Sequence, residues 1–112
     1  MDSKNIYKAA HYMLRIVSWE FHAGTEWFYF GDVKNMNVKE TQSLIEGRFT
    51  EDLLYFVDGR RNSFQVAKKD VAVEIKSRLH NQNILVCSLD FQSIFEINHI
   101  GSARYGKINS VD

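Results

Sequence analysis

Residues 53–67 read LLYFV DGRRN SFQVA, and this stretch decides the fold that we expect for the chain. Two runs rich in apolar and aromatic side chains flank a turn that begins with Asp58-Gly59. Such side chains favour strands, and Asp-Gly between two strands is a strong signal for a β-hairpin. Strands joined by a short turn pair in antiparallel fashion. The centre of the chain therefore predicts an antiparallel sheet.

A helix and further strands are predicted after this hairpin. Asp70 is placed to cap a helix over residues 71–80. The apolar stripe of this helix consists of Val71, Ala72, Ile75 and Leu79. The strands predicted after it cover residues 84–89, 94–97 and 105–108, of which the last gives the weakest signal.

Another helix is predicted before the hairpin, over residues 38–46. Asn37 and Glu40 fit a capping box, in which the Asn37 side chain accepts a hydrogen bond from the N–H of Glu40. Gly47 follows the apolar pattern directly and suits the C′ position beyond a helix end. We therefore expect the helix to stop at Glu46.

The N-terminal part of the chain allows two interpretations. The first is a helix over residues 3–11, then a strand within 12–22 that forms a hairpin with residues 27–30 around Gly24. The second is a single helix that continues to about residue 17, because the apolar spacing can be extended that far. We favour the hairpin, because residues 12–22 are rich in aromatic and β-branched side chains.

The order of these elements predicts the fold class. We expect residues 1–112 to form a single α+β domain, with a mainly antiparallel sheet of about five or six strands and two or three helices packed on one face. The chain is long enough for one hydrophobic core, and 45% of its residues are hydrophobic. It therefore needs no metal or disulfide for stability.

Charge and cysteine content narrow the functional classes. Lys plus Arg and Asp plus Glu are 14 each, so the net charge is zero, and dedicated nucleic-acid or membrane-surface binding is not expected. Cys87 is the single cysteine, which precludes an intrachain disulfide and fits a reducing compartment. The first residues lack a basic region followed by a long apolar run. We expect a cytoplasmic protein.

No catalytic or metal-binding motif emerges from the spacing of reactive residues. The histidines at positions 11, 22, 80 and 99 lack the spacing of metal ligands. Cys87 lies within an apolar strand and is expected to be a buried, inert thiol. The carboxylate pairs Glu51-Asp52 and Glu20 with Glu26 are interpreted as solvated side chains. We expect no enzymatic activity and no cofactor.

Two groups of charged residues are candidates for binding a partner. The acidic group comprises Glu46, Glu51 and Asp52, between the helix that starts after Asn37 and the central hairpin. The hairpin group comprises Asp58, Arg60 and Arg61, with Lys68 and Lys69 at the end of the following strand. The hairpin group would suit a nucleic-acid backbone, with aromatic side chains of the strands stacking on bases.

In size, in α+β pattern and in lacking a catalytic constellation, the chain resembles the small immunity proteins of bacterial contact-dependent growth inhibition systems. The resemblance implies a cytoplasmic inhibitor that binds a cognate toxin and blocks its active site or its access to substrate. For a nuclease toxin it implies an acidic surface on the inhibitor. The alternatives are a small nucleic-acid or ligand-binding domain that uses the Arg60-Arg61 hairpin, and an enzyme with a site assembled from isolated residues.

Overall fold

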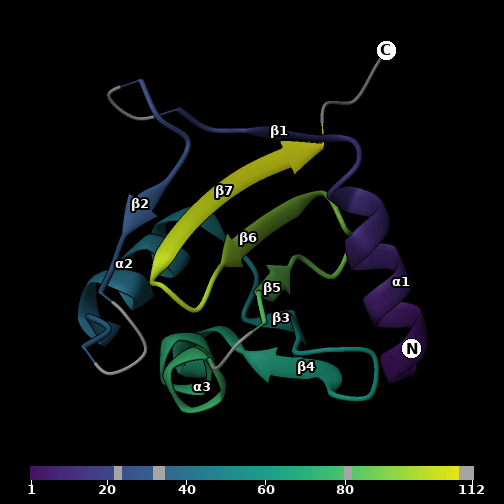
Figure 1. The fold of residues 1–112 in the computed structure, drawn as a ribbon. Helices are drawn as coiled ribbons and strands as arrows, with labels where there is room; N and C mark the ends of the chain where they lie inside the picture. Colours follow the sequence, from purple (N-terminus) through teal and green to yellow (C-terminus); the bar gives the residue numbers. More distant parts are fainter. Residues whose placement is uncertain (22–23, 32–34, 80–81, 109–112) are drawn as a thin grey trace.

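The structure is a computed structural model that describes residues 1–21, 24–31, 35–79 and 82–108 (Figure 1). Its helices are α1 (Ser3–Met13), α2 (Val38–Arg48) and α3 (Val71–Arg78), with a short 3₁₀ helix at Lys68–Asp70. Its strands are β1 (Val17–Trp19), β2 (Phe28–Tyr29), β3 (Leu53–Val57), β4 (Ser63–Ala67), β5 (Ile84–Cys87), β6 (Ser93–Ile97) and β7 (Ser102–Ile108). Within the described residues, no helix combines the length and apolarity needed to cross a membrane.

The seven strands of the described residues belong to one antiparallel sheet, in the order β1-β7-β6-β5-β3-β4, with β2 also paired to β7. The predicted α+β class and antiparallel sheet are confirmed. The central hairpin has the predicted bounds, and Phe56 of β3 lies opposite Phe64 of β4. The sheet contains one strand more than the upper expectation, because the last strand, which gave the weakest signal in the sequence, is present as β7.

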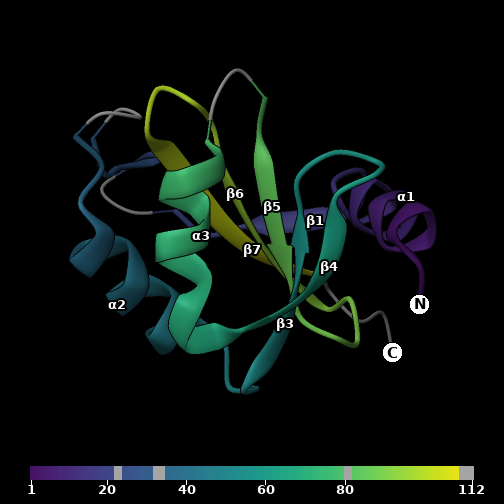
Figure 2. The same cartoon turned by 90° about the horizontal axis from the view of Figure 1, so that it is seen from below.

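Helices cover both faces of the sheet (Figure 2). α2 and α3 pack on one face, as expected, whereas α1 lies against the opposite face. Strand β5 shows why both faces need cover, because all four of its residues are buried. Ile84 and Val86 pack with α2 and α3, and Leu85 and Cys87 pack with α1. A strand that is buried on both faces is a continuous apolar run in the sequence.

The predicted N-terminal hairpin is wrong. β1 and β2 pair with β7, and the register sets Trp19 opposite Gly106 and Phe28 opposite Ala103. Both short strands are antiparallel to β7, so they run in the same direction along its edge. The edge is available because β7 is longer than predicted and begins at Ser102. An aromatic run favours a strand but does not specify its partner.

The helix boundaries resolve the open alternatives. α1 ends at Met13, residues 14–16 form a turn, and β1 starts at Val17, so neither the long helix nor a strand from residue 12 is present. Asn37 caps α2 as predicted, and its Oδ1 accepts the N–H of Glu40 at 2.9 Å. The predicted end at Gly47 is wrong, because α2 continues to Arg48. Gly47 keeps helical geometry, so its conformational freedom is not used to stop the helix.

Candidate functional site

The junction between α2 and β3 brings the three predicted acidic residues together. We call residues 46–53 the α2–β3 corner; it contains Glu46, Glu51 and Asp52. Phe49 anchors this corner, because its side chain is 2% exposed and its ring meets the edge of the Tyr105 ring at 5.5 Å between centroids. Glu46 is therefore held in the last turn of α2, and Glu51 and Asp52 lie on the bend that follows, next to an anchor fixed to the sheet.

The three carboxylates differ in the number of hydrogen bonds and ion pairs that they form within the protein. Glu46 Oε1 accepts a hydrogen bond from Gln42 at 2.8 Å, and Glu46 Oε2 lies 3.7 Å from the Lys68 ammonium. Glu51 accepts from the backbone N–H and the hydroxyl of Thr50, both at 3.2 Å. Asp52 is exposed, and its carboxylate has no hydrogen-bond or ion-pair partner among the described residues. Asp52 is thus the carboxylate most available to a partner.

A shallow hollow of about 410 Å³ lies beside the corner. Its lining consists of Glu46, Asp52, Leu53, Ala67, Lys68 and Lys69. Leu53 is 46% exposed and supplies an apolar centre. Lys68 is already engaged, because its ammonium donates to the carbonyl oxygen of Phe49 at 3.0 Å. The hollow thus combines one exposed apolar side chain with charged groups around it.

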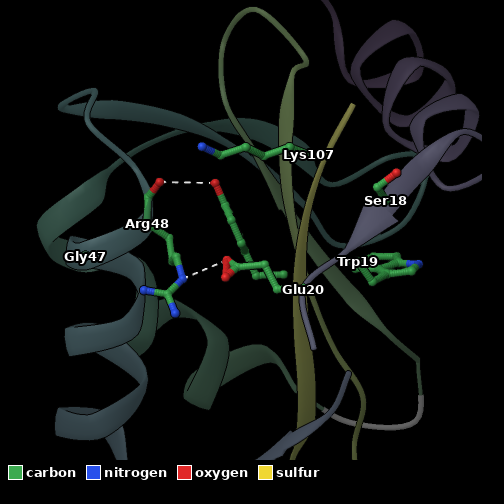
Figure 3. A pocket seen from close by; sticks show the side chains of 7 residues that line it. Ser18, Trp19, Glu20, Gly47, Arg48 and Lys107 are labelled. Carbon is green, nitrogen blue, oxygen red and sulfur yellow. Dashed lines mark hydrogen bonds and ion pairs between the residues drawn. The ribbon is translucent and has the colours of Figure 1, made fainter. Parts of the chain in front are cut away.

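A second hollow, of about 490 Å³, lies on the other side of the corner (Figure 3). Arg48 Nε pairs with Glu20 at 2.9 Å, and the Tyr105 hydroxyl donates to the Arg48 carbonyl oxygen at 3.2 Å. Burial raises the pKa of Tyr105, so this hydroxyl keeps its proton, and remains a donor, to a higher pH than an exposed tyrosine does. Figure 3 shows Lys107 extending over the hollow and Trp19 pointing away from it. Its charged groups are largely paired, which indicates a structural role for this hollow.

The predicted hairpin group does not form one site. Arg60 and Arg61 are exposed at the turn between β3 and β4, where the carbonyl oxygen of Arg60 accepts from the Ser3 hydroxyl at 2.6 Å. Lys68 and Lys69 follow β4 at the opposite end of the hairpin. A five-residue strand separates the two pairs by about 17 Å. The four cations therefore lie in two separate pairs at opposite ends of the hairpin.

Asp58 must be removed from the candidate surface. It is only 9% exposed, its Oδ1 accepts from Gln82 at 2.6 Å and its Oδ2 lies 3.5 Å from Arg78. The sequence placed Asp58 in a hairpin turn, where exposure is the ordinary expectation. It could not show that α3 and the segment after it would pack beside this turn.

The reactive residues also take structural positions. Cys87 is fully buried, as predicted, and burial raises the pKa of its thiol. Glu20 and Glu26 do not pair with each other, since Glu20 pairs with Arg48 and Glu26 with Arg104. Within the described part of the chain, no three His, Cys, Asp or Glu side chains are grouped to hold a metal ion. Two of the four histidines, His22 and His80, lie outside the described residues.

A cluster of side chains centred on Arg104 was not predicted from the sequence. The guanidinium of Arg104 lies over the rings of Trp19 and Trp27 and pairs with Glu26 and Glu96. These residues come from separate segments, and only the density of aromatics near residue 27 hinted at a surface there.

Comparison with known proteins gives no match: no family model, no curated protein and no solved structure matches this chain.

Proposed function

We propose that the chain is an immunity protein, an inhibitor that neutralises a cognate bacterial toxin by binding it through the α2–β3 corner. The observation that carries the proposal is the anchored corner itself. It presents Glu46, Glu51 and Asp52 next to the exposed side chain of Leu53. Phe49 holds this group in place, so little conformational entropy would be lost when a partner binds.

The chemistry of the corner suits a basic partner. A nuclease toxin must hold phosphate groups with Lys and Arg side chains, and carboxylates on an inhibitor can occupy the same positions. Complementary charge speeds association and makes it sensitive to salt. Leu53 would add the apolar contact that fixes the complex once it has formed. Inhibition of this kind needs no chemistry from the inhibitor, and in this proposal it takes place in the cytoplasm.

The direct test is to co-express the chain with the product of the gene immediately upstream of its own, taken as the candidate toxin. We expect the chain to restore growth and to co-elute with the toxin in size-exclusion chromatography. A stable complex that weakens as salt is raised would support the corner as the contact surface. Failure to bind that toxin and to restore growth would contradict the proposal.

The corner is tested by replacing its carboxylates with amides of the same shape. The variant Glu46→Gln/Glu51→Gln/Asp52→Asn should bind the toxin at least tenfold more weakly, since contact residues at the centre of an interface cost about 2 kcal/mol or more. The matched control is Glu40→Gln, which removes one exposed carboxylate from the first turn of α2, outside the corner. Equal affinity of a folded triple variant and its parent would remove the corner from the interface.

A further inference from the structure

Helix α1 covers only part of its face of the sheet. α1 packs on the part formed by β3, β4 and β5. The rest of this face carries what we call the aromatic half-face: Trp19, Glu26, Trp27, Tyr29, Glu96 and Arg104. Tyr29 is 68% exposed, and the side chains of Glu26 and Arg104 remain 27% and 21% exposed. A partner can therefore reach the outer side of this surface.

Pairing along the strands sets these side chains on one face. Tyr29 lies opposite Ser102 and Glu96 lies opposite Arg104. Side chains two residues apart in a strand share a face, so Ser102 and Arg104 point to the same side of β7. Tyr29 is consequently a diagonal neighbour of Arg104, at a separation of about 7–8 Å between such positions.

The aromatic half-face already binds one guanidinium group, which belongs to the chain itself. The central carbon of the Arg104 guanidinium lies 3.8 Å from the ring centroid of Trp19 and 4.5 Å from that of Trp27. Arg104 Nη1 donates to Glu26 Oε1 at 2.5 Å, and Arg104 Nε donates to Glu96 Oε1 at 2.8 Å. Stacking on indoles together with bonds to carboxylates is the geometry in which guanidinium groups are best held.

The charges of the aromatic half-face do not balance. It contains two carboxylates and one guanidinium, which leaves one negative charge in excess. Glu96 Oε2 is occupied by a hydrogen bond from Asn83 at 2.9 Å. Glu26 Oε2 has no partner among the described residues, and the Tyr29 ring is exposed on the same edge segment. An acceptor oxygen and an open aromatic ring are thus available for a second cation.

We infer that the aromatic half-face binds an arginine-bearing segment of a protein partner. An arginine of the partner would lie over the ring of Tyr29 and donate to Glu26 Oε2. Arginine fits better than lysine, because its planar group stacks and bonds at the same time. Aromatic rings on an open sheet also suit single-stranded nucleic acid, but Glu26 and Glu96 would repel its phosphates. This surface shares no residue with the α2–β3 corner, so the inference does not depend on the proposed function.

Intrinsic fluorescence can test this directly, because both tryptophans of the chain belong to the aromatic half-face. The probes are a short glycine–serine peptide with arginines at alternate positions, the same peptide with lysines, and oligothymidylate. At low salt we expect the arginine peptide to change the fluorescence saturably below about 1 mM, with the lysine peptide weaker. Absence of a saturable change with the arginine peptide, or tighter binding of oligothymidylate, would overturn the inference.

Variants locate the binding event on the surface. Tyr29→Ala and Glu26→Gln should each weaken binding of the arginine peptide about two- to fivefold, the size expected of one exposed cation–π contact or ion pair. Tyr12→Ala is the matched control, since Tyr12 is a 60% exposed tyrosine on α1. Tyr29 is exposed, so its variant should remain folded, and circular dichroism checks this. Equal effects of Tyr29→Ala and Tyr12→Ala would assign the fluorescence change to non-specific binding.

Discussion

The thiol of Cys87 lies at the centre of the face that α1 covers, opposite Tyr55 on one neighbouring strand and Ile94 on the other. Its burial raises its pKa far above the ordinary value of a free thiol. A thiolate would lose its hydration there without gaining a partner. Cys87 therefore fills space as an apolar side chain and offers no nucleophile to a substrate.

This burial predicts a pH dependence of stability. The unfolded thiol ionises near pH 8.5, whereas the native thiol keeps its proton. The unfolded state thus binds fewer protons above that pH, and the free energy of unfolding should fall by about 1.4 kcal/mol per pH unit. Urea titrations between about pH 8 and pH 9.5 measure this slope.

Cys87→Ala is the control for this prediction. It should cost about 1 kcal/mol at neutral pH, because a small buried side chain is lost, and it should remove the slope that the thiol contributes. All other side chains are the same in both proteins, so their contributions cancel in the comparison. The same slope in both proteins would show that the native thiol ionises and is accessible. Slow labelling of the native thiol would agree with burial.

At the scale of elements, local patterns were sufficient wherever a pairing was local. The β3–β4 hairpin follows from alternating side chains and an Asp-Gly turn, and the Asn37 cap follows from residues three positions apart. The first hairpin failed because its strands find their partner at β7, more than seventy residues further along the chain. No local feature of residues 17–30 contains that information.

Glycine positions provide a test of the β1–β7 edge. At Gly106 an added Cβ would lie 2.5 Å from the carbonyl oxygen of Ser18 and 2.7 Å from a methyl of Val17. Gly106→Ala should therefore destabilise the protein by about 1–3 kcal/mol through overpacking. Gly47 lies within α2 and has open space around its Cβ position. Gly47→Ala should stabilise by about 0.5–1 kcal/mol, because alanine is the better helix former.

Thermal or urea unfolding of the two glycine variants measures both effects in one experiment. Opposite signs are expected, since the same methyl group is added at a crowded site and at an open one. Unchanged stability of Gly106→Ala would mean that β1 does not approach β7 as closely as described. Destabilisation by Gly47→Ala would indicate that α2 ends before this residue, as the sequence pattern alone had suggested.

At the scale of the whole molecule, the sequence predicted the candidate site in part. Glu46, Glu51 and Asp52 are close in sequence, so their common position at the α2–β3 corner was predictable. The cluster around Arg104 was not, because its members come from the β1–β2 edge, β6 and β7. Helices on both faces were also missed, although the continuous apolar run of β5 carries that signal.

The arrangement of the two cores predicts a single cooperative unfolding transition. Strands β3, β5 and β6 contribute side chains to both clusters, so neither core can lose its order without exposing the other. The N-terminal strands join this unit through β7, which pairs with β1, β2 and β6. A domain of this size with shared strands is expected to unfold in two states.

Two probes at different places in the molecule check the prediction. Tryptophan fluorescence follows only the β1–β2 edge, where both tryptophans lie, whereas far-ultraviolet circular dichroism is dominated by the three helices. In urea the two signals should change together, with the same midpoint and slope. A fluorescence midpoint at lower urea would show that the edge opens before the core. The aromatic half-face would then be assembled on a separately mobile segment, and binding of an arginine-bearing partner should raise that lower midpoint towards the other.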